Sequence, residues 1–198
     1  MTTITYGNIL AVFFSASETE LIEGAEWYRQ AETIARTLAH RYGLADFRIA
    51  AGVIAALSPN NRWQRNVSDA DALIRIHCAG EEYDTIKVST YSKNKEKGIA
   101  ILNGTTPLDA LGGQKVRSFY NCIIGSDDIC IDGHAYSIWK GRRIATTKTP
   151  KITAKLYASI AGDYRKATSV INAVTGLSYK ASQIQAITWI AWRSQFTK

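Results

Sequence analysis

The spacing of apolar and polar residues along the chain is helical almost throughout. Ser17 and Glu20 have the spacing of a capping box, and the apolar stripe that follows them ends at Gly43. Asp46 stands where an N-cap is expected, directly before a short buried helix over Phe47–Leu57. The alternation of period two that marks β-strands is nearly absent, so the pattern predicts an all-α protein.

Helical patterns continue to the end of the chain. We expect helices over 67–77, over 91–102, from Thr106-Pro107 to the turn at 112–113, over 116–123, after Asp132, and from Pro150 to Ile160. Two more are expected after an N-cap at Asp163 and after an N-cap at Ser178 or Ser182, while Asp128–Ile131 is expected to be extended. The pattern therefore predicts about eight to ten helices in one domain, or in one domain of two lobes.

Length and composition exclude several classes of protein. The chain has 198 residues, 46% of them apolar, which is enough for one domain with a sizeable core. Its longest apolar stretch, Ile49–Leu57, is too short to span a membrane, and residues 1–6 do not have the pattern of a secretory signal. Cys78, Cys122 and Cys130 lack the spacing of metal ligands, and their odd number argues against a disulfide scaffold. This pattern indicates reduced thiols in the cytoplasm and no metal.

The net charge of +7 comes from one segment of the chain. Between Lys87 and Lys155 there are twelve basic and five acidic residues, whereas the rest of the chain is balanced. A concentrated excess of positive charge favours a polyanionic partner, and nucleic acid is the simplest one. A solvated lysine-rich face without a partner is the alternative.

Four short segments carry further information. In chain order they are Leu57–Asn61, Tyr91–Ile99, Leu111–Val116 and Ile129–His134. The first closes the buried helix, the second opens a basic helix, the third is a glycine-rich turn into a helix, and the fourth contains an aspartate. Each segment alone is a weak signal, so their order and spacing carry the interpretation.

In that order and spacing, the segments resemble the helix-hairpin-helix superfamily of DNA glycosylases, which includes endonuclease III and oxoguanine glycosylase. The resemblance covers about residues 45–140, and the strings Ala56–Pro59 and Gly113–Tyr120 also resemble a group of actinobacterial and phage proteins. It implies one glycosylase-like domain over 1–198, with a helix-hairpin-helix-like element, whose second lobe is completed by helices of 1–44 and 141–198. It also implies a monomer that binds the backbone of double-stranded DNA, extrudes one base, and needs no cofactor.

The resemblance assigns the chemistry to Asp132 and Lys115. A fixed carboxylate would stabilise the positive charge that develops on the sugar as the base leaves, and would orient a water. The alternative role of Asp132 is the N-cap of the next helix. Lys115 matches the lysine that forms a Schiff base in bifunctional members, which requires desolvation or neighbouring cations; its alternative role is phosphate contact. His134 would pack behind Asp132 or contact DNA.

The remaining site residues would hold the DNA. Gly112, Gly113 and Gln114 would open a helix whose backbone N–H groups bind a phosphate, although such glycines also suit an ordinary turn. Asn60 and Asn61 match amides that fill the gap left by the extruded base, with helix capping as the alternative. The basic residues expected to contact DNA are Arg62, Lys93, Lys95 and Arg117.

Three other functions stay open at this point. The same fold would serve a phage-type enzyme that modifies hypermodified thymine bases and leaves the glycosidic bond intact. A non-catalytic nucleic-acid-binding module would use Asp132 only as a cap. An unrelated helical protein would use the lysine-rich segment to bind a different partner.

Overall fold

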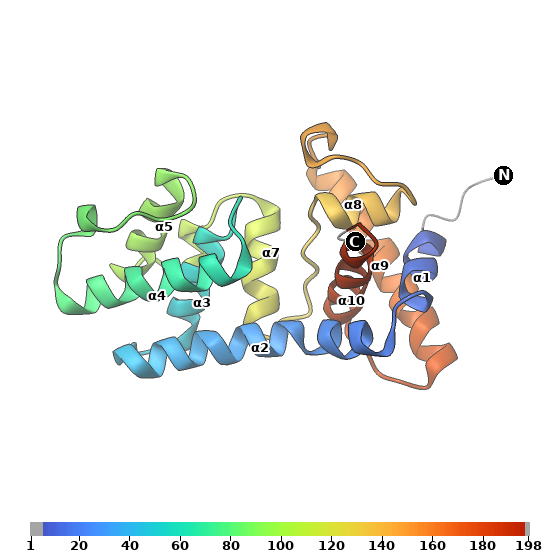
Figure 1. The fold of residues 1–198 in the computed structure, drawn as a ribbon, viewed down its shortest axis with the longest axis horizontal. Coiled ribbons are helices and arrows are strands. Elements are labelled where there is room, and N and C mark those ends of the chain that lie inside the picture. The colour runs from blue at the N-terminus through green and yellow to red at the C-terminus, as the bar shows by residue number, and fades with distance from the viewer. Residues whose placement is uncertain (1–5, 197–198) are drawn as a thin grey trace. The chain divides into compact units, whose positions relative to one another are not determined.

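The computed structural model describes residues 6–196, which form ten α-helices and two short 3₁₀-helices, with no β-strand in this part of the chain (Figure 1). The all-α prediction and the expected number of helices are therefore confirmed. The helices group into two compact units. Unit 2 is the continuous stretch Arg29–Ser126, whereas unit 1 combines Met1–Tyr28 with Asp127–Lys198. Residues 1–5, where no secretory signal is expected, lie outside the described part.

Unit 2 is built around one central helix, α3. Its elements are the second half of α2 (Glu18–Tyr42), α3 (Phe47–Leu57), α4 (Trp63–Ala79), η1 (Tyr83–Thr85), α5 (Ser92–Leu102), α6 (Pro107–Ala110) and α7 (Gln114–Ile123). Helices α4, α5, α6 and α7 all pack on α3, and every residue from Ala50 to Leu57 is buried. This explains why α3 is apolar on all sides rather than along one stripe.

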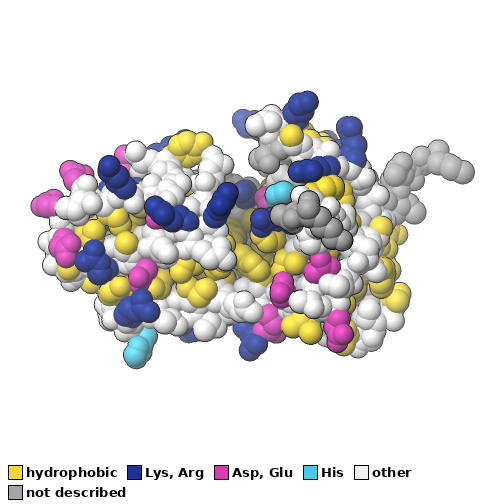
Figure 2. Space-filling view, in the orientation of Figure 1, with side chains coloured by type: hydrophobic (Ala, Val, Ile, Leu, Met, Phe, Trp, Pro, Cys, Tyr) yellow, Lys and Arg dark blue, Asp and Glu magenta, His cyan; other side chains and the backbone are white. Residues whose placement is uncertain are grey.

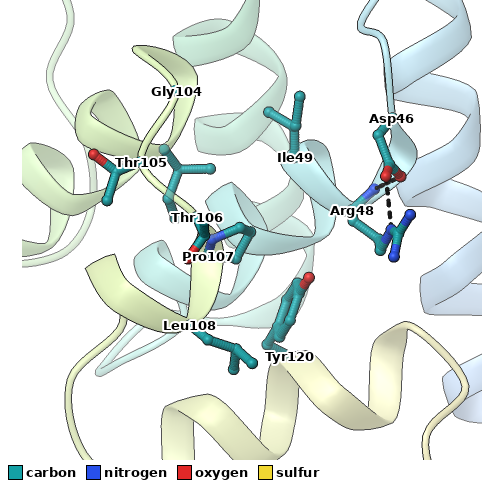
Figure 3. Close-up of a pocket in the computed structure, with 10 residues that line it drawn as sticks. Asp46, Arg48, Ile49, Gly104, Thr105, Thr106, Pro107, Leu108 and Tyr120 are labelled. Carbon is teal, nitrogen blue, oxygen red and sulfur yellow. Dashed lines mark hydrogen bonds and ion pairs between the residues drawn. The ribbon is translucent and has the colours of Figure 1, made fainter.

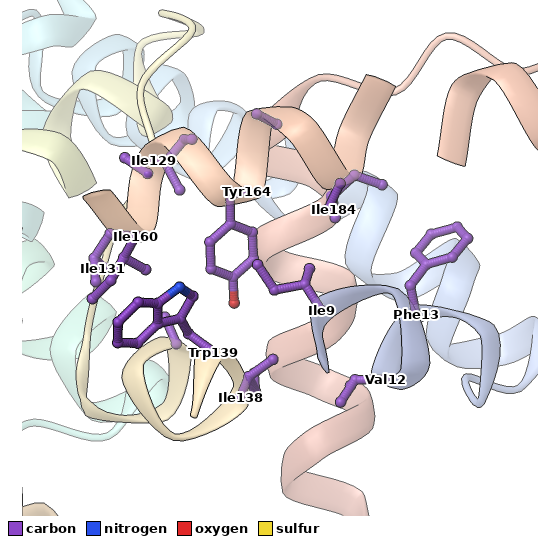
Figure 4. Close-up of a cluster of buried hydrophobic side chains, with 14 of the residues drawn as sticks. Ile9, Val12, Phe13, Ile129, Ile131, Ile138, Trp139, Ile160, Tyr164 and Ile184 are labelled. Carbon is purple, nitrogen blue, oxygen red and sulfur yellow. The ribbon is translucent and has the colours of Figure 1, made fainter. Parts of the chain in front are cut away.

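Unit 1 has a core to which both flanking stretches contribute. Its elements are α1 (Tyr6–Phe14), the first half of α2, α8 (Gly133–Trp139), η2 (Thr146–Lys148), α9 (Ala154–Thr175) and α10 (Ala181–Ser194). Buried side chains of α1, α8, α9 and α10 form one apolar cluster around the fully buried Tyr164 (Figure 4). Within it, Trp139 Nε1 donates a hydrogen bond of 2.8 Å to Asp163 Oδ2, which ties α8 to α9.

Several helix ends are where local sequence signals predict them. Ser17 N donates to Glu20 Oε2 over 2.8 Å and Glu20 N donates to Ser17 Oγ over 3.3 Å, so the capping box is formed. Asp46 caps α3 by accepting the N–H of Arg48. Thr106 caps α6 in the same way, with proline at the first helical position.

Other helix ends differ from the predictions. The helix expected from Pro150 and a second one capped by Asp163 are wrong, because α9 is continuous and begins after Thr153, which caps it. The carboxylate of Asp163 is buried and accepts the hydrogen bond from Trp139, so a tertiary contact explains this aspartate. Neither Ser178 nor Ser182 caps α10, whose N-cap residue is Lys180. Helix α1 was not expected at all.

The first half of α2 crosses α10 at Gly24 with backbone-to-backbone contact. A Cβ atom placed on Gly24 would lie 2.3 Å from Ile187 Cα and 2.6 Å from Ile187 N, both of them main-chain atoms. Gly24 is buried and helical, and its φ angle does not require glycine. The glycine is therefore required by the closeness of the two helices.

The described helices include none with the length and apolar character needed to cross a bilayer. Cys122 and Cys130 are buried thiols, and Cys78 is an exposed thiol. No disulfide joins any of them within the described residues.

Candidate functional site

Two of the four motif segments are joined in unit 2. The hydroxyl of Thr90 donates to Pro59 O over 2.7 Å, and Asn60 Nδ2 donates to the hydroxyl of Tyr91 over 2.6 Å. Asn60 is exposed and has a positive φ of 56°, the backbone state of a tight turn in which asparagine is tolerated. The turn after α3 therefore lies against the start of α5. Asn60 faces solvent in this arrangement.

A buried carboxylate, Asp69, holds this junction together. Its Oδ2 accepts hydrogen bonds from Asn61 Nδ2 at 2.9 Å and from the backbone N–H of Ser89 at 2.8 Å, and Arg65 Nε lies 3.5 Å from Oδ1. Asn61 Nδ2 also lies 3.3 Å from Leu57 O. The amide of Asn61 is thus used inside the unit, which favours a positioning role for this residue.

The glycine-rich turn leads into α7, as predicted. Gly113 is the N-cap residue with a φ of 76°, and it has no side chain to occupy the first N–H groups of the helix. Arg117 Nε donates to Leu111 O over 2.8 Å and so fixes the turn from within the unit. Gln114 Nε2 donates to Ser118 Oγ over 3.2 Å. A helix start of this kind favours an anion.

The basic residues expected to contact DNA in unit 2 differ in their surroundings. Lys95 Nζ donates to Tyr83 O and Ile86 O, at 2.6 and 2.8 Å, and so is engaged within the unit. Lys93, by contrast, is exposed, with its Nζ 5.9 Å from the centre of the Tyr91 ring. Arg62, at the N-cap of α4, is exposed as well.

Two lysines flank the glycine-rich turn. Lys115 lies in the first turn of α7 and is exposed, so burial within unit 2 does not desolvate its amine. Lys97, on α5, lies beside the turn, because a Cβ placed on Gly112 would be 3.0 Å from its Nζ. Two cations beside the start of α7 suit contact with a phosphate, while a neighbouring cation also meets one requirement of a Schiff-base lysine, so the position of Lys97 is compatible with both candidate roles of Lys115.

Asp132 lies in unit 1 and is the N-cap of α8, as predicted. Its Oδ1 accepts the N–H of Ala135 over 2.8 Å, and the side chain is half-buried. The other carboxylate oxygen has no hydrogen-bond partner among residues 6–196. Asp132 is thus held at the start of α8 by one oxygen, and its second oxygen makes no hydrogen bond within the described residues.

The segment before Asp132 is clamped by a buried tyrosine. The hydroxyl of Tyr157 donates to Ile129 O over 2.7 Å and accepts the N–H of Ile131 over 2.9 Å. Asp128–Ile131, expected to be extended, is neither helix nor strand. Burial raises the pKa of Tyr164, a hydrogen bond between its hydroxyl and that of Thr188 opposes this, and the negative charge of Asp132 adds to the rise. The hydroxyl of Tyr164 is therefore neutral at physiological pH.

Three side chains of unit 1, those of His134, Trp27 and Arg193, contact the ring of Trp189, and we call this group the Trp189 cluster. The ring of His134 meets the ring of Trp189 edge-to-face at 6.3 Å, and Trp27 meets Trp189 at the same distance. The guanidinium of Arg193 lies 4.4 Å from the centre of the Trp189 ring. Trp27, Trp189 and His134 are half-buried, so part of each ring is accessible. No sequence motif marks Trp27, Trp189 or Arg193, and the abundance of aromatic residues near them was the only available signal.

Unit 1 also carries a stretch of cations without acids. From Gly133 to Gly162 there is no acidic residue, and the six basic residues are all exposed. We call them the basic segment: Lys140, Arg142, Arg143, Lys148, Lys151 and Lys155. None of the six forms an ion pair with a described residue. Figure 2 shows Lys and Arg side chains gathered over the segment that follows α8.

Comparison with known proteins gives a family but no activity. A family model described as a family of unknown function, DUF7178, matches residues 2–196. No curated protein and no solved structure matches the chain. The resemblance to DNA glycosylases therefore stays a prediction. Because the match covers almost the whole chain, including both units, the protein belongs to the DUF7178 family.

Proposed function

We propose that this protein binds DNA and cleaves the N-glycosidic bond of an extruded base, with Asp132 as the catalytic carboxylate. The observation that carries the proposal is the state of Asp132. One oxygen is fixed by the backbone of α8 and the other has no partner within the described residues, two positions before His134 in the Trp189 cluster. A rigid carboxylate that presents a free oxygen is the arrangement that stabilises a developing cation.

The other features of unit 1 suit a nucleotide. The Trp189 ring is partly accessible and the guanidinium of Arg193 lies over it, so an aromatic and a cationic group that can contact a base lie together. The basic segment supplies charge for the phosphates without nearby acids to neutralise it. In the reaction, the bond from the sugar C1′ to the base nitrogen breaks, and its electron pair leaves with the base. The hydroxyl of a water then adds to C1′, and the proton passes to the departing base.

Unit 2 would hold the DNA backbone. The start of α7 at Gly113, together with Lys97, Lys115 and Lys93, offers N–H groups and cations of the kind that bind phosphates. Asn60, exposed on its turn, would enter the gap left by the base. In this role Lys115 is not a nucleophile, and the protein is a hydrolase without abasic-site lyase activity.

A second function is favoured by one contact. The hydrogen bond from Ala135 N to Asp132 is by itself sufficient reason for an aspartate at this position. The protein would then be a nucleic-acid-binding module that uses the same basic segment and performs no chemistry. An enzyme that modifies a base without releasing it is a third outcome, and it would also need the free oxygen.

Asp132→Asn separates the catalytic role from the cap, because asparagine caps helices as well as aspartate does. We expect base release from duplexes carrying uracil, oxoguanine or alkylated bases to fall by about a hundredfold or more, since the amide lacks the negative charge. DNA affinity and the melting temperature should be unchanged. Asp132→Ala, which removes both the charge and the cap, should also be less stable by about 1 kcal/mol.

The products are followed by chromatography of released bases and by mass spectrometry of intact nucleosides. If the wild-type protein releases no base but changes nucleoside mass in a manner that needs Asp132, the modifying enzyme is the correct function. Equal activity of wild type and Asp132→Asn would leave Asp132 as a cap only. Borohydride trapping that disappears in Lys115→Ala would restore the lyase role of Lys115.

The basic segment should determine DNA affinity. We expect the replacement of Lys148, Lys151 and Lys155 by glutamine to weaken binding to duplexes of any sequence. The plot of log affinity against log salt concentration should also become less steep, by about one unit of slope for each phosphate that the variant no longer binds. The measurement is fluorescence anisotropy at several salt concentrations. Arg75→Gln, which removes a cation already paired with Glu81, is the matched control and should leave the slope unchanged. Equal slopes in wild type and the triple variant would contradict the proposal.

A further inference from the structure

Unit 2 contains a pocket to which none of the four motif segments assigns a role. Its volume is about 340 Å³, and it lies where the start of α3, the end of α5, the start of α6 and the middle of α7 meet (Figure 3). Ile49, Pro107 and Leu108 contribute apolar surface, and Tyr120 and Arg48 contribute polar groups. The volume is at the lower end for small-molecule sites, which run from about 300 to 1,000 Å³.

Tyr120 is the main reason to expect a ligand here. The residue is 4% exposed, and its hydroxyl has no hydrogen-bond partner among the described residues. Figure 3 shows the hydroxyl at the pocket end of the ring, directed toward the space beside Pro107 and Arg48. Burial is the main cause that raises the pKa of Tyr120, so the hydroxyl keeps its proton. Among the described residues, the buried side-chain polar atom that lacks a partner is Asn66 Oδ1, so the Tyr120 hydroxyl is not enclosed by protein and can donate to a ligand in the pocket.

The second polar group of the pocket is also a donor. Arg48 donates its backbone N–H to Asp46 Oδ1 over 2.9 Å and its Nε to Asp46 Oδ2 over 2.6 Å, so both oxygens of Asp46 are already used. The terminal guanidinium N–H groups of Arg48 have no partner within the described part of the chain. The pocket therefore offers N–H and O–H donors, while the carboxylate at its rim has its acceptors occupied.

The apolar surface limits the shape of the ligand. Leu108 is 46% exposed and stands with Pro107 on one side of the Tyr120 ring. Ile49, which is half-buried, adds apolar surface from α3. A flat apolar body would cover these groups, and an acceptor attached to it would satisfy the two donors.

We propose that this pocket binds a small aromatic carboxylate, with its ring against Pro107 and Leu108 and its carboxylate toward Tyr120 and Arg48. The pocket includes neither Asp132 nor any residue of the basic segment, all of which belong to unit 1, so its binding of a ligand does not rest on the proposed catalytic role of Asp132. A negatively charged acceptor fits better than a neutral one, since hydrogen bonds to charged groups are the stronger ones.

The test uses benzoate as the probe and benzyl alcohol as its uncharged comparison, with the full chain. In two-dimensional NMR, benzoate should shift the backbone amides of residues 46–49 and 104–108 in a saturable way, and benzyl alcohol should do so far more weakly. Tyr120→Phe should weaken benzoate binding by about tenfold without loss of stability, because the hydroxyl makes no bond in the unit. Arg48→Gln should weaken it as well, and Tyr179→Phe, a tyrosine of unit 1, should leave it unchanged.

Two results would overturn the proposal. One is that millimolar benzoate shifts no resonance of these residues. The other is that Tyr120→Phe binds benzoate as well as the wild type does. Should Arg48→Gln unfold, circular dichroism would show it, and Tyr120→Phe alone would decide.

Discussion

Replacing Gly24 by alanine should destabilise unit 1 by about 3 kcal/mol, because a single methyl group would collide with the main chain of α10. The added Cβ would stand 2.3 Å from Ile187 Cα, and main-chain atoms cannot turn aside as a flexible side chain can. Relief would require α2 and α10 to move apart, which would open the apolar cluster that α10 helps to form. Cores resist such separation because they are closely packed.

Urea unfolding followed by tryptophan fluorescence measures this effect, since four of the five tryptophans, all but Trp63, lie in unit 1. Gly162→Ala is the matched control. Gly162 lies within α9, and no atom is found within 4 Å of a Cβ placed on it. That variant should be as stable as the wild type or more stable by up to about 1 kcal/mol, because alanine favours helix. Equal midpoints for wild type and Gly24→Ala would show that the two helices are not in contact at Gly24.

Removing the carboxylate of Asp69 should have an effect of similar size on unit 2. Asp69→Ala would leave Asn61 Nδ2 and the N–H of Ser89 without their acceptor, with an expected loss of about 3 kcal/mol. Asp69→Asn should lie between wild type and alanine, because one oxygen still accepts. The hydrogen bonds that join the turn after α3 to the start of α5 would break before the rest of unit 2 unfolds.

Amide hydrogen exchange at Ser89 and neighbouring residues is the specific readout for Asp69, because a general loss of stability would raise exchange throughout unit 2. Glu81→Ala is the control, since Glu81 is paired with Arg75 on the surface and should contribute little. If Ser89 is protected equally in Asp69→Ala and wild type, the carboxylate does not hold this junction.

The fold class and many helix ends could be predicted from the sequence because they depend on local signals. The capping box at Ser17 and Glu20, the cap at Asp46 and the cap at Asp132 all act within three residues of themselves. The prediction at Asp163 was wrong because aspartate is a common N-cap residue. In the structure its carboxylate instead accepts a hydrogen bond from Trp139, which is distant in the sequence. A local pattern does not contain that contact.

The candidate site was predictable in part for the same reason. Asp132 could be found because it stands at a helix start in a recognisable string. Trp27 and Trp189 come from opposite ends of the sequence, so only the fold shows that they share one cluster with His134. The pocket at Tyr120 could not be predicted from the sequence either, because four helices contribute its walls. In the sequence, Tyr120 has the position of an ordinary residue on the apolar face of α7.

The division of the chain has a consequence for its synthesis. All the helices of unit 2 lie in one uninterrupted stretch, whereas unit 1 requires α1 from before that stretch and α8 to α10 from after it. On the ribosome, α1 emerges before unit 2, and its apolar face stays uncovered until α8, α9 and α10 have been translated. Premature termination anywhere in α9 or α10 would therefore leave a nascent chain in which unit 2 is complete and unit 1 has no closed core, a species that chaperones or proteases would recognise.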